Sequence, residues 1–345
     1  MELKRGINLG GYLSQCVHTE EHYDRFIQAE DFQKIFRMGF DHVRLPIDYN
    51  VLEEDDGTPK EAGYERVYHV IDWCAANGLN LVLDLHKAYG YDFNDAGNKE
   101  KNTLFTSRNL QNRFVELWKN IALHFWGCPN IAFELLNEVV ETEHAERWNI
   151  LIRKTVKTIR QVDPRVTIIY GGIQWNSATT LKYLEQPMDS NIMYTFHFYE
   201  PLLFTHQKAH WVAAMDPDAE ISYPADRAEY QERSLRLGEQ GKTVTDSHCG
   251  KMDIHFLESV FADAVRTAQE RGVRLYCGEF GVIDKAPLPD TLAWLRDVTA
   301  LFEQDQIGYA LWTYKDMDFG LMEEHYAPIR NDMVRLLTGK QWVSR

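Results

Sequence analysis

Two glutamates in the sequence stand where carboxylates can do chemistry. Glu138 closes the run NIAFELLNE and Glu279 follows the run VRLYCG, so each carboxylate comes directly after apolar residues that are typical of a buried strand. A carboxylate in such a place is costly to bury unless it is paired. If the two strand ends meet, one carboxyl group can donate a proton while the other, ionised, attacks carbon or activates water. This pair is the minimum apparatus for the hydrolysis of a glycosidic bond.

Further polar and aromatic side chains come at the ends of other apolar runs, and singly each of them has an ordinary structural explanation. They are Arg44 in HVRLP, His86 in LVLDLH, Asn137 beside Glu138, His197 and Tyr199 in FHFY, and Trp312 in ALWTY. We expect the Arg44 charge to lower the pKa of Glu279, and Tyr199 to donate to the same carboxylate. We expect Asn137 to hydrogen-bond a sugar hydroxyl, the two histidines to complete a polar ring, and Trp312 to offer an indole face to a sugar ring.

The elements that must position these side chains alternate along the whole chain. Short apolar runs predict strands at 3–9, 41–45, 79–85, 131–136, 166–170, 192–198, 273–278 and 308–313. Amphipathic patterns between them predict helices at 29–38, 64–77, 110–125, 143–161, 254–271 and 290–304, with a weaker one at 177–184. Eight strand–helix repeats predict an α/β fold, a (β/α)8 TIM barrel, in which chemistry lies at the carboxyl ends of the strands. The alternative is an open doubly wound sheet, but the sequence has no GxGxxG dinucleotide-binding loop after its first predicted strand.

One segment departs from this alternation. About fifty residues, 200–252, separate the sixth strand from the next helix, and they carry prolines, glycines and several aromatic residues. Loops of more than about 15 residues are usually functional or disordered. We interpret 200–252 as an elaborated loop at the active-site face of a single domain that spans residues 1–345. Aromatic residues on the predicted rim loops are candidates for sugar-binding subsites: Tyr89, Tyr91, Trp175, Phe204 and Trp211.

Composition and charge exclude several classes of protein. The formal net charge is −15, and no Lys/Arg cluster occurs, which argues against binding to nucleic acid or to an anionic membrane surface. The cysteines are five, scattered and without a CxxC pair, so neither a disulfide framework nor a zinc site is predicted. No cofactor or metal is expected. The first residues lack the apolar run of a signal peptide, which predicts a cytoplasmic protein as the sequence stands, or a secreted one if a leader was removed.

The motifs in chain order resemble those of glycoside hydrolase family 5, the cellulase family of retaining (β/α)8 enzymes. The matching motifs are RGINLGG, HVRLP, LVLDLH, FELLNE, FHFYEP, YCGEFG and ALWTY, and they span residues 5 to about 320. The resemblance implies that Glu138 is the acid/base and that Glu279 is the nucleophile. It also matches six supporting positions one for one: Arg44, His86, Asn137, His197, Tyr199 and Trp312.

The same resemblance implies a β-glycan or oligosaccharide substrate. Members of the family act chiefly on β-1,4-glucans, so hydrolysis of β-1,4-glucan or of cello-oligosaccharides is our first expectation. FYEPLLFTHQ resembles a stretch of cellulase-like bacterial members, whereas RGINLGGYL is similar to the exo-acting β-1,3-glucanase branch. An exo-β-1,3-glucanase or a β-mannanase of the same family is therefore the alternative. Endo or exo action and the oligomeric state stay open.

Two other classes are compatible with a barrel of this kind. A metal-dependent hydrolase would use His86, His197, Glu138 and Glu279 as ligands, but the HxH pair typical of the first strand of such enzymes is missing from RGINLGG. A catalytically inactive barrel that only binds carbohydrate would not need both glutamates.

Overall fold

The structure, a computed structural model, is a closed eight-stranded parallel barrel and describes residues 1–212 and 214–342. The strands follow one another around the barrel in the order β1-β10-β9-β6-β5-β4-β3-β2. Their bounds are β1 Arg5–Asn8, β2 His42–Asp48, β3 Asn80–Lys87, β4 Ile131–Glu134, β5 Thr167–Gly171, β6 Ile192–Phe198, β9 Arg274–Phe280 and β10 Gly308–Leu311. All eight coincide with predicted strands to within a few residues, and the prediction of a (β/α)8 barrel is confirmed.

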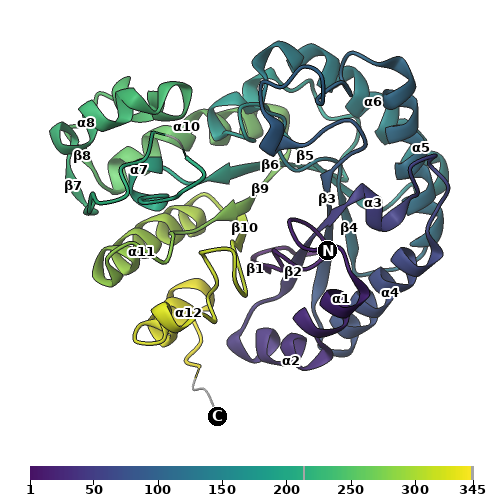
Figure 1. The fold of residues 1–345 in the computed structure, drawn as a ribbon, viewed down its shortest axis with the longest axis horizontal. Coiled ribbons are helices and arrows are strands. Elements are labelled where there is room, and N and C mark those ends of the chain that lie inside the picture. Colours follow the sequence, from purple (N-terminus) through teal and green to yellow (C-terminus); the bar gives the residue numbers. More distant parts are fainter. Residues whose placement is uncertain (213, 343–345) are drawn as a thin grey trace.

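Helices surround the barrel on its outer face (Figure 1). They are α1 Glu20–Phe26, α2 Ala29–Met38, α3 Tyr49–Leu52, α4 Glu61–Ala76, α5 Arg108–His124, α6 Ala145–Val162, α10 Ile254–Arg271, α11 Leu288–Gln304 and α12 Arg330–Thr338, with 3-10 turns η1 Phe93–Asp95, η2 Thr142–His144, η3 Ala178–Tyr183 and η5 Glu324–Tyr326. The bounds of α2 and α10 match the prediction, and both end at a left-handed glycine, Gly39 and Gly272. The weak helix predicted at 177–184 is the 3-10 turn η3.

Three of these helices, α1, α12 and the four-residue α3, were not predicted from the sequence. α1 buries one residue, Tyr23, so its seven residues carry no apolar stripe that the pattern could reveal. α12 is a nine-residue helix that buries Met333, Val334 and Leu337 against the barrel's outer layer. Among the described residues, no helix combines the length and the apolar composition that crossing a bilayer would need.

The interior of the barrel is layered. A small apolar cluster is separate from the large core between sheet and helices; it consists of Leu3, Val82, Ala132, Ile169, Met193, Tyr276 and Ala310. Side chains two residues apart on a strand share a face, so Val82 is followed on the inner face of β3 by Asp84 and then by His86. On β4, Ala132 is followed in the same way by Glu134. The barrel therefore has an apolar floor, a charged layer above it, and the site at the carboxyl ends of the strands.

The segment 200–252 contains short elements rather than an irregular loop. They are α7 Leu202–Thr205, β7 Ala225–Asp226, α8 Arg227–Arg236, η4 Gly238–Gly241, α9 Lys242–Thr245 and β8 Lys251–Met252. Figure 1 shows α7, α8, β7 and β8 grouped at one side of the barrel, beyond β6. The segment is attached to α11, because Trp294 donates to the Glu200 carbonyl at 2.9 Å and the Tyr223 hydroxyl donates to Asp297 at 2.8 Å.

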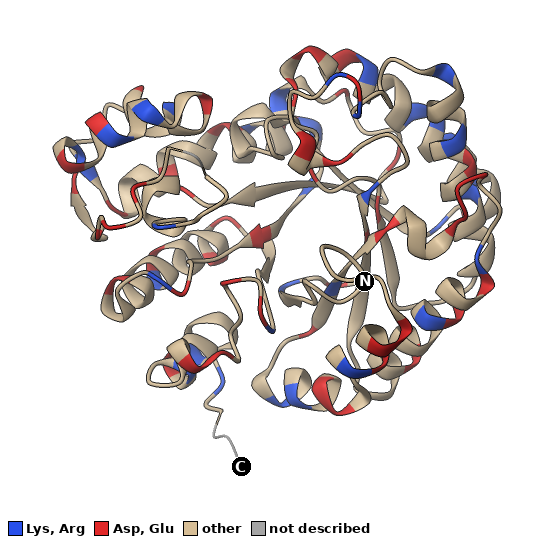
Figure 2. Ribbon diagram, in the orientation of Figure 1, with Lys and Arg blue, Asp and Glu red and all other residues tan. Residues whose placement is uncertain are grey.

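Charged residues of both signs are distributed over the helices around the barrel (Figure 2). The buried charged residues include Arg44, Asp84 and Glu134, which form the layer described below, and the two glutamates of the site. Such burial requires pairing, because an unpaired charge inside a protein is far more costly than one on the surface.

Candidate active site

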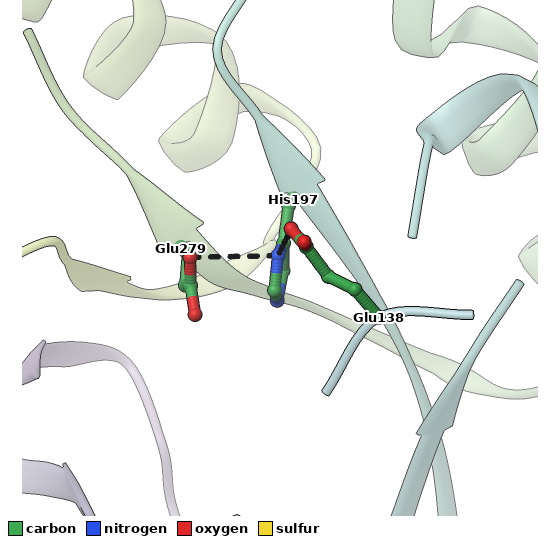
Figure 3. A group of neighbouring side chains, drawn as sticks. All are labelled: Glu138, His197 and Glu279. Atoms are coloured by element: carbon green, nitrogen blue, oxygen red, sulfur yellow. Dashed lines mark hydrogen bonds and ion pairs between the residues drawn. The ribbon is translucent and has the colours of Figure 1, made fainter. Parts of the chain in front are cut away.

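The two glutamates singled out in the sequence lie side by side at the carboxyl ends of the strands. Glu138 follows β4 and Glu279 lies on β9, with His197 of β6 between them (Figure 3). One side-chain oxygen of each glutamate and one ring nitrogen of His197 all lie within 4.8 Å of one another. Both glutamates are nearly buried, with 8% and 5% of their surface exposed.

This separation decides between two reaction geometries. Retaining glycosidases hold their two carboxyl groups about 5–5.5 Å apart, whereas inverting enzymes need about 6.5–9.5 Å to admit a water molecule. The Glu138–Glu279 spacing corresponds to the retaining class.

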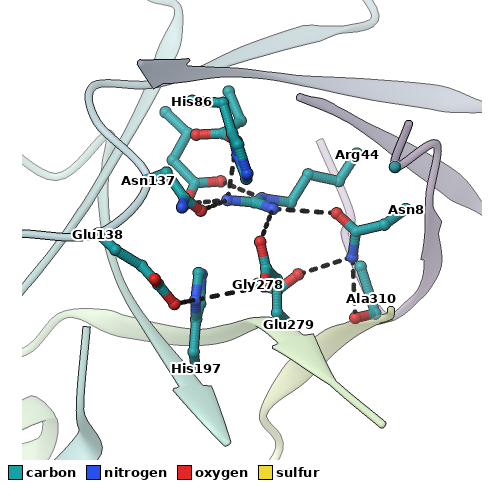
Figure 4. A network of polar contacts seen from close by, with 12 residues as sticks. Asn8, Arg44, His86, Asn137, Glu138, His197, Gly278, Glu279 and Ala310 are labelled. Atoms are coloured by element: carbon teal, nitrogen blue, oxygen red, sulfur yellow. Dashed lines mark hydrogen bonds and ion pairs between the residues drawn. The ribbon is translucent and has the colours of Figure 1, made fainter. Parts of the chain in front are cut away.

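Arg44 lies at the centre of a buried network beneath Glu279 (Figure 4). Its Nη1 donates to Glu279 Oε1 at 2.7 Å and to Asn8 Oδ1 at 3.0 Å. Its Nε donates to Glu134 Oε2 at 2.8 Å, and its Nη2 lies 3.0 Å from Asp84 Oδ2. The guanidinium is fully buried and uses its fork of donors on several strands at once.

The network holds more acidic groups than Arg44 can neutralise. Burial raises the pKa of Asp84 and of Glu134 to about 7, and the Arg44 charge limits both shifts. Sequence reasoning missed Asp84, Glu134 and Asn8. The available signal was an acid inside an otherwise apolar strand, in LVLDLH and IAFELL.

Glu279 is the better stabilised anion of the two glutamates. Burial raises the pKa of Glu279, while the nearby Arg44 charge opposes that shift. The Tyr199 hydroxyl donates to Glu279 Oε2 at 3.0 Å, as its position in FHFY predicts. The Arg44 charge lowers the pKa of Glu279 as predicted, but desolvation of the carboxylate outweighs that effect, so the pKa lies above its ordinary value and not below it.

Glu138 has no such cation in contact. Burial raises the pKa of Glu138 well above its ordinary value, and the Glu279 charge adds to the shift. Its Oε1 lies 2.7 Å from Nδ1 of His197, whose pKa burial lowers well below the ordinary value. A neutral imidazole and a protonated carboxyl group at this distance form one hydrogen bond. Glu138 is therefore suited to hold a proton while Glu279 is ionised.

The remaining predicted residues surround the pair. Asn137 Oδ1 accepts from Arg44 at 2.9 Å, so the amide orientation is set and its NH2 group is left for another acceptor. His86 lies 2.6 Å from Asp84 through Nδ1, and burial lowers its pKa to about 4. The rings of His86 and Trp312 stack, with centroids 5.9 Å apart and planes 3° apart.

A large cavity opens above these residues. Its volume is about 1410 Å³, more than the roughly 300–1,000 Å³ usual for small-ligand sites, which suits a chain of sugars. Its walls include Glu138, Glu279 and Trp312 from the barrel, and residues of the segment 200–252 such as Trp211 and Thr243.

The five aromatic candidates divide into two groups. Trp175 and Trp211 line the cavity, and Trp211 is 47% exposed. The expectation for the other three is wrong, because each is committed to packing. Tyr91 is buried and its hydroxyl accepts from the Val140 amide, Phe204 is fully buried against Tyr223, and the Tyr89 ring lies under the Arg113 guanidinium at 3.7 Å.

Further aromatic side chains that were not selected from the sequence line the cavity, among them Phe93, His206 and Phe319. A signal was available for two of them, because Phe93 follows Tyr89 and Tyr91 in YGYDF and His206 lies close to Phe204 in the aromatic segment 200–252. Phe93 contacts His86 edge to face, and Phe319 packs against Tyr199 in the same way.

Glu138, His197 and Glu279 also form a set with the spacing of metal ligands. The chemistry of their surroundings does not suit a cation. Glu279 is already bonded to the Arg44 guanidinium and to Tyr199, and Nδ1 of His197 is bonded to Glu138. A metal ion here would lie close to a buried, permanent positive charge.

Comparison with known proteins gives consistent matches over the whole chain. The family model described as Cellulase (glycosyl hydrolase family 5) matches residues 5–318. Endoglucanase C of Acetivibrio thermocellus is 40% identical over 346 residues, which cover 99% of both proteins. Cellodextrinase A of Ruminococcus flavefaciens is 38% identical over 304 residues, 88% of this chain and 83% of that protein. The structure of Thermotoga maritima Cel5A with cellobiose, in a mutant form, superimposes with a TM-score of 0.78 at 26% identity, over 98% of this chain and 97% of that one.

Proposed function

This chain belongs to glycosyl hydrolase family 5, the cellulase family, and we propose that it hydrolyses β-1,4-glucan with retention of anomeric configuration. The observation that carries the proposal is the pair of buried carboxyl groups, whose oxygens lie within 4.8 Å of each other in unequal surroundings. One is bonded to an arginine and a tyrosine, the other to a neutral histidine.

The proposed reaction is a double displacement. The ionised Glu279 attacks the anomeric carbon and forms a glycosyl ester, while Glu138 gives its proton to the departing glycosidic oxygen. Glu138, now ionised, then takes a proton from water, and the resulting hydroxyl attacks the same carbon and releases Glu279. The charge on Glu138 changes between the steps, which requires a pKa near the working pH.

Cello-oligosaccharides are the substrates that we propose, in soluble form rather than as insoluble cellulose. Support comes from the names of the relatives, an endoglucanase and a cellodextrinase, and from the cellobiose that Thermotoga maritima Cel5A binds. In this chain, the free NH2 group of Asn137 and the ring of Trp312 face the cavity beside Glu279 and can bind a sugar hydroxyl and a sugar face.

The test is a substrate panel with resolved products. Cellotetraose, carboxymethylcellulose, barley β-glucan, laminarin and mannan are incubated with the wild-type protein and with Glu279→Gln as the background control. We expect the highest kcat/KM on cellotetraose and barley β-glucan, and the β-anomer as the first product seen by proton NMR. A preference for laminarin or mannan would overturn the substrate, and the α-anomer as first product would overturn the mechanism.

A further inference from the structure

The end of β5 differs from the strand ends on both sides of it. β4 leads to Glu138 and β6 carries His197, whereas β5 is followed by the turn Gln174–Asn176. All three residues of this turn are in the left-handed region, with φ of 52°, 54° and 55°. A left-handed conformation costs a non-glycine residue roughly 1–2 kcal/mol, so three in succession persist only where the surroundings enforce them.

The turn connects the two segments that hold the Glu138–His197 hydrogen bond. At one end the Gln174 amide donates to the carbonyl of Val140, two residues after Glu138, at 3.2 Å. At the other end the His197 amide donates to the carbonyl of Asn176 at 2.8 Å. The backbone of the turn therefore spans from the Glu138 loop to β6, across the end of β5.

The Asn176 side chain locks this conformation. It is fully buried, and its Oδ1 accepts from the Gly172 amide at 3.1 Å. A Cβ at Gly171 would lie 1.8 Å from Oδ1, so a glycine is needed at 171 to admit the amide. Asparagine is also among the residues that tolerate the left-handed region best.

The same side chain lowers stability in another respect. Among the described residues, Nδ2 of Asn176 is buried without a hydrogen-bond partner. An unsatisfied buried donor costs about 1–3 kcal/mol. The asparagine is thus better explained by the conformation that it imposes than by its contribution to packing.

We propose that Asn176 is a positioning residue, which fixes the left-handed turn and through it the placement of His197 against Glu138. The inference rests on the proposed function, since it concerns the proton transfer that Glu138 performs. Trp175 of the same turn lines the cavity.

The test compares substrates that differ in their need for a proton. Asn176→Ala removes the Oδ1 acceptor and disfavours the left-handed backbone, Asn176→Gly removes the acceptor alone, and Asn176→Asp keeps it. The substrates are cellotetraose, whose leaving group needs protonation, and 2,4-dinitrophenyl β-cellobioside, whose leaving group does not. Gln306→Gly is the matched control, because Gln306 is also left-handed (φ 55°) but exposed at the opposite end of the barrel, before β10.

For Asn176→Ala and Asn176→Gly we expect kcat/KM on cellotetraose to fall by a factor between about 10 and 100. On the aryl substrate, kcat/KM for the release of dinitrophenol should fall by less than about 3-fold. Water that reaches Glu138 through the loosened turn will lower its pKa, so the basic limb of the pH profile will move to lower pH. Asn176→Asp is expected to return the ratio of kcat/KM on cellotetraose to kcat/KM on the aryl substrate most of the way to its wild-type value. Gln306→Gly is expected to leave this ratio unchanged.

Equal losses on both substrates with an unmoved basic limb would overturn the proposal, and so would wild-type behaviour of Asn176→Gly. If Asn176→Ala does not fold, as judged by urea unfolding, the glycine variant decides. Failure of the proposed function is a different result, because the wild-type protein would then be inactive on cellotetraose before any substitution.

Discussion

Glu279 and Glu138 are neighbours, but the two sides of the site hold them by different means. Glu279 lies over a layer of buried charges, in which Arg44 bonds to side chains from several strands (Figure 4). Glu138 lies beyond the end of its strand and is bonded to one imidazole, in a loop whose Val140 carbonyl accepts from the Gln174 amide. The ionised carboxylate is thus stabilised by a fixed positive charge, whereas the carboxyl group that changes its charge is kept away from cations.

The largest effect is expected from the nucleophile. Glu279→Gln keeps the shape of the side chain but removes the attacking oxygen anion, and kcat should fall by about 10⁴-fold or more on every substrate. Because attack precedes everything else, cellotetraose and 2,4-dinitrophenyl β-cellobioside should be affected alike, which steady-state rates on both will show. Activity within about 10-fold of the wild type, a change in the activation barrier of no more than about 1.4 kcal/mol, would remove Glu279 from this role.

Glu138→Gln should give a smaller and substrate-dependent loss. Without a proton donor, kcat on cellotetraose should fall by about 10²–10⁴-fold. On the dinitrophenyl substrate the first turnover should be nearly unaffected and the hydrolysis of the glycosyl-enzyme slow, so a burst of dinitrophenol should precede a slow steady state. Equal losses on both substrates, without a burst, would show that the two sides of the site do not differ as we describe.

Arg44→Met tests the buried charge. Removing one partner of a buried ion pair costs about 3–5 kcal/mol of unfolding free energy, because Asp84 and Glu134 lose their cation. Without Arg44 the pKa of both acids rises further above about 7. At low pH Asp84 and Glu134 are protonated in the wild type and in Arg44→Met alike, so the loss of the cation adds no cost from these two acids. This cost grows as the pH rises through 7. The deficit in urea unfolding should therefore be larger at pH 8 than at pH 5.

The matched substitution on the other side of the site is His197→Asn, which removes one neutral hydrogen bond and should cost about 1 kcal/mol at either pH. A pH-independent deficit for Arg44→Met, or an equal one for His197→Asn, would contradict the comparison.

Tyr199→Phe should give the smallest change. The hydroxyl donates to the ionised form of Glu279, so its removal raises the pKa of that carboxyl group. The acidic limb of kcat/KM against pH should move up by about half a unit to one unit, while the basic limb, which reports Glu138, stays in place. If the basic limb moved instead, that limb would report Glu279 and the acidic limb would report Glu138.

Local sequence determined much of the molecule. Apolar runs of strand length and the amphipathic stretches between them are short-range features, and they predicted the (β/α)8 barrel. The resemblance to the cellulase family is confirmed by the family match over residues 5–318. Glu138 and Glu279 could be named because one follows a strand and the other lies near the end of one, and parallel strands in a closed barrel end on one rim.

Closure of the barrel decided the rest. Which acids meet Arg44 depends on closure of the barrel, which brings the neighbouring strand β3 and the more distant strands β4 and β9 to one guanidinium. No single segment of the chain encodes this relation. Trp175 and Trp211 reach the cavity while Tyr91 and Phe204 are buried, because the loops that carry them pack against distant elements. The left-handed turn at Asn176 is likewise held by Gly172, Val140 and His197 together. Periodicity and composition are properties of neighbours in the chain, whereas charge pairing and burial are properties of neighbours in space.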